Sequence, residues 1–190
     1  MVAGFLLGFL DFVWIKYVPF PFGGLGNSIA VWAVAAFLLT FWSRWKLVGA
    51  VVGAVVFLVV AVPSYYVAAA LIQNDDWSNV YSAVALLWMG LAVVAGAVFG
   101  AGGVLARTPS RWQIPAAALP AAVLFAEGAI QLARGDRRAE TLGYVAVLVA
   151  LAVAVTLLIV RGRRPRGLAL AYAVPLTAVG YLMLLASGFR

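Results

Sequence analysis

Two carboxylates fall inside apolar segments, where an acidic group is costly to bury. Asp11 lies about nine residues into the first apolar segment, roughly 13 Å along a helix, and Glu127 lies about 14 residues into the fifth. A charged side chain at the centre of a membrane helix costs about 2.5–3.5 kcal/mol on insertion scales. We interpret both as ligand-binding or proton-coupling groups, and the alternative is a buried structural hydrogen bond or ion pair.

Other polar residues lie at a similar depth in their segments. Tyr65 and Tyr66 follow Pro63, which bends a helix, and Gln131 lies one turn beyond Glu127 on the same face. These groups fall from the middle of their segments outward, which predicts an outward-facing polar pocket or a shared buried network. Tyrosines at this depth are also typical of an interfacial aromatic belt.

The residue types that are absent from the sequence limit the kinds of site that the chain can form. The chain has no His and no Cys, so the sequence predicts no catalytic residue, no metal site and no cofactor. Asp75 and Asp76 are adjacent on a polar loop, and without a third spaced carboxylate they indicate a solvated turn. We therefore expect a protein that is not an enzyme.

The composition is that of a membrane protein. Of 190 residues, 66% are hydrophobic and 10% are charged, and a soluble domain cannot hide so much apolar side chain. We expect an all-α, polytopic transmembrane helical bundle that forms a single domain over residues 1–190, in a bacterial cytoplasmic membrane. The net charge of +7 comes from short loops and fits lipid headgroups, not nucleic acid.

The hydropathy pattern divides the chain into about seven spans, joined by short polar or Pro/Gly-rich links. The first two are short for a crossing, so the alternative is six spans with one of them re-entrant. No basic residue precedes Asp11, so we expect a retained first helix and not a cleaved signal peptide. The predicted spans are residues 2–18, 28–42, 47–72, 83–106, 114–133, 141–160 and 168–187.

The loop charges predict an orientation. Loops 43–46, 107–113 and 161–167 carry two, two and four positive charges and no negative one. The alternate loops carry zero, minus two and plus one; they are 19–27, 73–82 and 134–140. Cytoplasmic loops are enriched in Lys and Arg, so we expect the N-terminus inside and the C-terminus outside.

Three pairs of glycines have four-residue spacing, which places both members on one helix face. Such pairs allow close approach of helices in lipid. We interpret them as packing surfaces within the chain, and the alternative is an interface with a partner subunit or a second copy. The helix-packing glycines are Gly4, Gly8, Gly49, Gly53, Gly96 and Gly100.

A set of motifs resembles a family of small multi-spanning proteins from high-GC Gram-positive bacteria, known only as a domain of unknown function. The motifs are Gly4-x3-Gly8, Asn27-Ser28-x3-Trp32-x3-Ala36-Phe37, Tyr65-Tyr66, Trp88, Gly96-x2-Phe99-Gly100-x2-Gly103 and Glu127. This resemblance covers most of the chain and implies no activity. The chain is also similar to the substrate-binding subunits of energy-coupling-factor transporters, although a seventh span and an outside C-terminus depart from their plan.

Three functions follow, in order of preference. The first is binding or transport of a small molecule in the outward-facing pocket, with Asp11, Tyr65, Tyr66, Glu127 and Gln131 as its residues. The second is a non-catalytic subunit that assembles with partner proteins through its glycine faces. The third is a membrane enzyme that modifies lipid.

Overall fold

The computed structural model describes residues 1–134 and 139–186. In these residues the secondary structure consists of helices joined by short turns, without a strand. Part of the predicted loop 134–140, and the predicted end of the last span at residue 187, lie outside these residues. The helices are α1 (Val2–Tyr17), η1 (Phe22–Asn27), α2 (Ile29–Trp42), α3 (Leu47–Gln73), η2 (Trp77–Tyr81), α4 (Ala83–Arg107), α5 (Gln113–Ala117), α6 (Leu119–Ala133), α7 (Ala139–Ile159) and α8 (Arg163–Ala186).

Short polar side chains fix where several helices begin. The Ser28 hydroxyl accepts from the backbone N–H of Val31 at the start of α2, and Ser82 does the same for Ala85 in α4. Asp76 accepts from the N–H of Ser78 and caps the 3-10 helix η2. The backbone and side-chain hydrogen bonds from Ser78 hold the pKa of Asp76 below its usual value, so this aspartate supports the turn.

Most predicted spans coincide with helices, and the fifth and seventh differ. The predicted span 114–133 is divided into α5 and α6, which meet at Ala118. Pro120 is the second residue of α6 and has no backbone N–H to bond back into the previous turn, so the helix is interrupted there. The last helix begins at Arg163, within the basic segment that we expected to be a loop.

Within the described residues, four helices are long and apolar enough to cross a membrane: α3, α4, α7 and α8. Helices α2 and α6 are apolar but have only 14 and 15 residues, and α1 has 16. A helix of 14 residues is about 21 Å long, whereas the hydrocarbon core is about 30 Å thick. The seven-span count and the six-span alternative both stay predictions.

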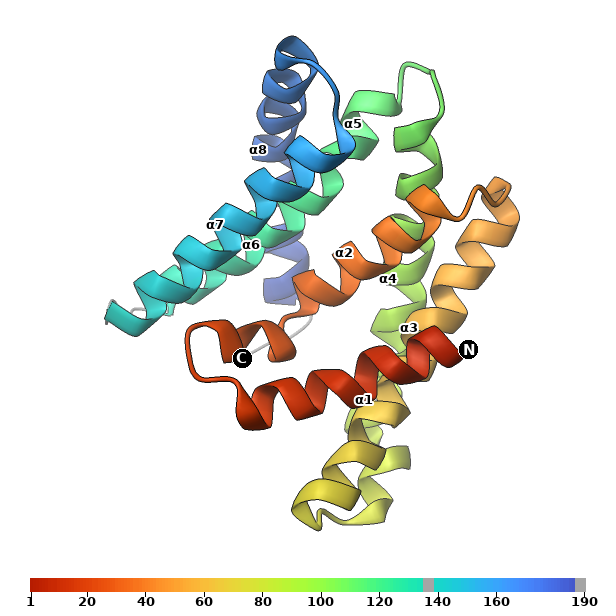
Figure 1. The fold of residues 1–190 in the computed structure, drawn as a ribbon, viewed down its shortest axis with the longest axis vertical. Coiled ribbons are helices and arrows are strands. Elements are labelled where there is room, and N and C mark those ends of the chain that lie inside the picture. Colours follow the sequence, from red (N-terminus) through yellow and green to blue (C-terminus); the bar gives the residue numbers. More distant parts are fainter. Residues whose placement is uncertain (135–138, 187–190) are drawn as a thin grey trace.

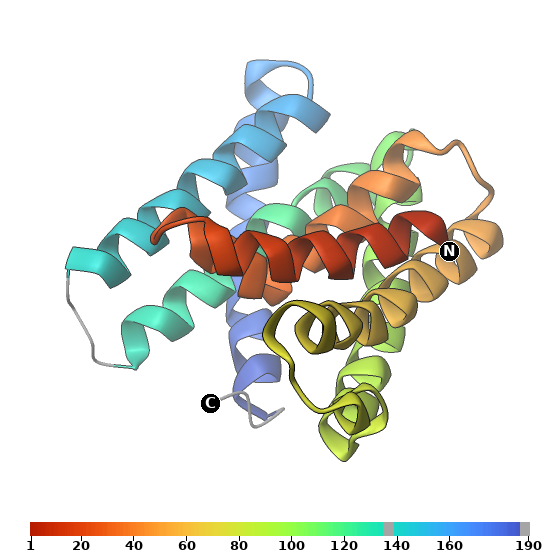
Figure 2. The ribbon, with the colours of Figure 1, turned by 60° about the horizontal axis from the view of Figure 1, so that its bottom comes forward.

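Helix α2 occupies the middle of the molecule (Figure 1). On one side it packs against α4, which in turn packs against α3, and on the other side it packs against α6. Helices α6, α7 and α8 form the second group, and Figure 2 shows them beside the first when the bottom of the molecule comes forward. The core between the helices is rich in alanine, which lets the helix axes approach closely.

Helix α1 runs beside the second half of α3 and in the same direction. Gly4 lies against the backbone of Phe57, and Gly8 lies against the backbone of Ala61. Near the end of both helices the Lys16 ammonium donates to the Gln73 amide oxygen, at 3.4 Å. The turn that follows α1 is therefore next to the turn that follows α3.

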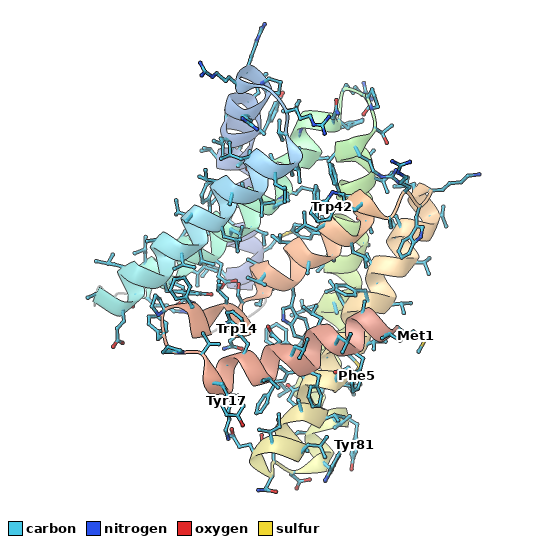
Figure 3. The ribbon with its side chains drawn as sticks, in the orientation of Figure 1. Met1, Phe5, Trp14, Tyr17, Trp42 and Tyr81 are labelled. Atoms are coloured by element: carbon cyan, nitrogen blue, oxygen red, sulfur yellow. The ribbon has the colours of Figure 1, made fainter. Side chains whose placement is uncertain are left out.

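The three basic turns lie at one end of the molecule, uppermost in Figure 1. Arg107 donates to the carbonyl of Trp45, which ties the first two of these turns together, and Arg107 and Arg161 line the same hollow. In Figure 3, Trp42 lies toward this end, whereas Tyr17 and Tyr81 lie toward the other. Between the ends, large apolar side chains such as Val94 and Val149 are exposed, which suits a lipid-facing surface.

Candidate ligand-binding site

The first turn of α2 holds the carboxylate of Glu127. This glutamate comes from α6, is only 4% exposed, and accepts hydrogen bonds from the Ser28 hydroxyl at 3.0 Å and the Ala30 backbone N–H at 2.9 Å. Backbone N–H groups at a helix N-terminus lack partners within the helix, and the helix dipole favours negative charge there. The helix end therefore compensates for the burial of the carboxylate.

Tyr144 of α7 completes the surroundings of Glu127. Its hydroxyl lies 2.6 Å from Oε1 of Glu127 and 3.2 Å from the carbonyl oxygen of Gly24 in η1. A hydroxyl has one proton, so Tyr144 donates to one of these acceptors at a time, and the shorter contact is to Glu127. These contacts join α6, α7, α2 and η1.

Asp11 of α1 lies on the other side of the same turn. The indole N–H of Trp32 donates to its Oδ2 at 2.7 Å. Both carboxylates that the sequence singled out therefore bind the segment from Ser28 to Trp32, through different side chains. Glu127 is enclosed, whereas Asp11 borders open space.

That space is a partly open cavity of about 380 Å³ between α1, the start of α2, α3 and α4. A volume of this size is within the range of small-molecule sites, roughly 300–1,000 Å³. The polar groups that line it come from Asp11, Asn27, Ser28, Trp32, Tyr65 and Tyr66. Helix α4 supplies an opposite wall that includes Trp88, Ala92 and Ala95.

The cavity has a single charged group on its walls. Among the described residues, Asp11 is the only acidic side chain that lines it, and no Lys or Arg does so. Apart from Asn27 and Ser28, the remaining walls are aliphatic or aromatic. The cavity is thus an apolar, aromatic space with one carboxylate.

The other predicted site residues lie in different places. Tyr65 and Tyr66 line the cavity with Asp11, and their rings make an edge-to-face contact with centroids 5.7 Å apart. Glu127 is connected to the cavity through Ser28 and does not line it. Gln131 is partly buried one turn beyond Glu127 and is not among the lining residues.

The glycines of the three predicted pairs also differ from one another. Gly96 and Gly100 pack against Val55 and Ala54 of α3, and Gly4 and Gly8 pack against the same helix from α1. Gly53 faces the ring of Trp45, and nothing lies within 4 Å of the position that a Cβ of Gly49 would take.

Sequence reasoning did not assign roles to Ser28, Trp32 and Tyr144. Ser28 and Trp32 entered only through the family motif. Tyr144 left no signal, because a lone tyrosine in an apolar segment is typical of many membrane helices. No group of three or more acidic side chains that could hold a metal ion occurs within residues 1–134 and 139–186.

These features define a class: a helical bundle whose described residues include four helices suited to cross a membrane, with a small cavity that carries one carboxylate. The chain belongs to the family of unknown function DUF6518, whose model matches residues 1–187. No curated protein and no solved structure matches the chain.

Proposed function

We propose that this protein binds a small molecule in the Asp11 cavity, as a transporter or as a binding subunit, and that it is not an enzyme. The observation that carries the proposal is the cavity itself, which has a volume of about 380 Å³ and a carboxylate on its wall. A buried acidic group is costly in a membrane protein, and functional sites are where such groups are kept. Glu127 belongs to the support of this site, because it holds the turn that carries Ser28 and Trp32.

We further propose that the end with the basic turns faces the cytoplasm of a bacterial cell. The cavity is lined by the first part of α4, from Trp88 to Ala95, and α4 starts at the opposite end. In this orientation the cavity lies in the outer half of the membrane. A solute from outside would reach it without crossing the whole bilayer.

The alternative role, assembly with a partner through glycine faces, has less support. Gly4, Gly8, Gly96 and Gly100 are occupied by contacts within the chain. Gly49 is exposed and open, so any assembly through these pairs would use that part of α3. The similarity to energy-coupling-factor subunits also stays a prediction.

The test is to fill the cavity. Ala95 lines it, and the neighbouring Val94 is 59% exposed on the outside of α4. We expect a small molecule to co-purify with the full chain in mild detergent, and to be lost in Ala95→Phe but retained in Val94→Phe. Mass spectrometry of the extracted solutes checks this. Equal retention in both variants, or no solute with the unaltered protein, would contradict the proposed function.

A further inference from the structure

The charge on the cavity wall limits the ligands that suit it. The chain carries 13 Lys and Arg against six Asp and Glu, yet the only charged side chain on the described walls of the cavity is Asp11. An anionic ligand would meet this carboxylate with no basic group to offset the repulsion. A neutral ligand would offer the Asp11 carboxyl group no opposite charge, whereas a cation would favour its ionised form.

Aromatic rings surround the same space. Trp32, Tyr65, Tyr66 and Trp88 all line the cavity. The faces of such rings attract cations, with a stabilisation of about 0.5–1 kcal/mol at exposed sites and about 2 kcal/mol or more when water is excluded. A carboxylate among four aromatic rings is therefore suited to a positive group.

Two of these rings are held in place by contacts within the chain. The N–H of Trp32 lies in the plane of the indole, so the hydrogen bond to Asp11 uses the edge of the ring and not its face. Tyr65 is fixed by an edge-to-face contact with Phe12 of α1, with centroids 5.3 Å apart. The cavity is thus formed before a ligand arrives.

The wall of the cavity suits a bare metal ion poorly. Asp11 is its only carboxylate among the described residues, and Leu58, Val62 and Leu91 supply no oxygen, whereas hard cations are held by several carboxylate and carbonyl oxygens. An alkylated ammonium group needs no such shell, because its carbon groups contact apolar walls while its charge faces Asp11.

We propose that the ligand of this cavity is an organic cation, such as an alkylated ammonium compound, with its positive group between Asp11 and the aromatic rings. This inference rests on the proposed function, that the cavity binds a small molecule. It adds the charge and chemical class of that molecule.

Three probes of nearly equal shape test the charge: choline, the neutral 3,3-dimethylbutan-1-ol and the anion 3,3-dimethylbutanoate. Benzyltrimethylammonium serves as a larger cation. Binding to the full chain in nanodiscs of neutral lipid is measured by equilibrium dialysis with radiolabelled compounds. We expect at least one cation to bind about tenfold or more tightly than the alcohol, and the anion not to bind.

Variants assign the binding to the named groups. Asp11→Asn keeps an oxygen for Trp32 and removes the charge, so we expect it to lose about tenfold or more of the affinity for the cation. The control Glu140→Gln removes an exposed carboxylate outside the cavity and should change nothing. Tyr66→Leu should bind the cation more weakly than Tyr66→Phe, because only Tyr66→Leu loses the ring.

The outcomes separate this inference from the proposed function. If the neutral or anionic probe binds as tightly as the cations, the cavity binds small molecules and the cation inference is wrong. If no probe binds, the cation inference is also overturned, and the co-purified solute in the Ala95→Phe experiment still decides the proposed function.

Discussion

At the scale of single residues, Glu127 has the strongest structural role of the groups around the cavity. It accepts from a hydroxyl of α2, a backbone N–H of α2 and a hydroxyl of α7. Each of these donors is buried, and a buried donor that loses its acceptor costs about 1–3 kcal/mol. The carboxylate therefore holds three helices together without a basic partner among the described residues.

We expect Glu127→Ala to lower the free energy of unfolding by about 3 kcal/mol, because Ser28, Ala30 and Tyr144 lose their acceptor together. Glu127→Gln keeps one acceptor oxygen and should cost less. Unfolding by SDS titration in mixed micelles, followed by circular dichroism, measures the difference. Glu140→Ala is the matched control on an exposed glutamate, and a Glu127→Ala protein as stable as this control would contradict the assignment.

The sequence identified the two acidic positions but not their partners. A carboxylate in an apolar segment stands out by its cost alone, so Asp11 and Glu127 were predictable. Their partners are neutral and distant along the chain: Ser28 is 99 residues from Glu127, and Trp32 is 21 residues from Asp11. For Glu127 the sequence left a buried hydrogen bond or ion pair as the alternative to a ligand site, and the structure places this carboxylate in hydrogen bonds at the N-terminus of α2.

At the scale of helices, the contact between α1 and α3 depends on Gly8. A Cβ built there would lie 2.8 Å from the carbonyl carbon and closer still to the carbonyl oxygen of Ala61, and 3.0 Å from the backbone nitrogen of Tyr65. Backbone atoms cannot move aside as a side-chain tip does, so the two helices would have to separate. This contact also positions Asp11 beside Tyr65.

We expect Gly8→Ala to lower the free energy of unfolding by about 1–3 kcal/mol, the usual cost of overpacking. Gly49→Ala makes the same change in a helix where nothing lies within 4 Å, so it should not destabilise the protein. The same SDS titration compares the two. Equal stability of both variants would show that the close approach of α1 and α3 is not needed for the fold.

Helix bounds were more predictable than helix packing. Hydropathy placed the start of α3 at Leu47 and the start of α4 at Ala83, as the structure has them. Neither signal shows that α1 lies beside the second half of α3, because that register depends on which glycine meets which backbone carbonyl. The break at Ala118 was missed because apolar residues continue through it and only Pro115 and Pro120 mark it.

At the scale of the whole molecule, charge and topology agree. The three basic turns lie at one end (Figure 1), and the acidic turn that contains Asp75 and Asp76 follows α3 at the other. The turn after α1 belongs to the acidic end, because Lys16 reaches Gln73. The positive-inside rule then predicts that the basic end faces the cytoplasm and the acidic end faces outward.

The absence of cysteine makes this orientation directly measurable, since each introduced cysteine is the only thiol in the chain. We expect an impermeant maleimide to label Phe20→Cys and Ser78→Cys in intact cells. Arg44→Cys and Arg111→Cys should be labelled only after the membrane is permeabilised. All four positions are exposed in turns or at the ends of helices, so access depends on the side of the membrane and not on burial.

Each outcome of the labelling bears on a different part of the topology. The reverse pattern would mean that the basic end faces outward and that the cavity opens to the cytoplasm. Labelling of Ser78→Cys but not Phe20→Cys in intact cells would contradict the pairing of α1 with the end of α3, because the contact between Lys16 and Gln73 requires both turns on one side. A result that follows the prediction would leave α1 and η1 on the outer side, with α2 leading from the cavity to the cytoplasmic end.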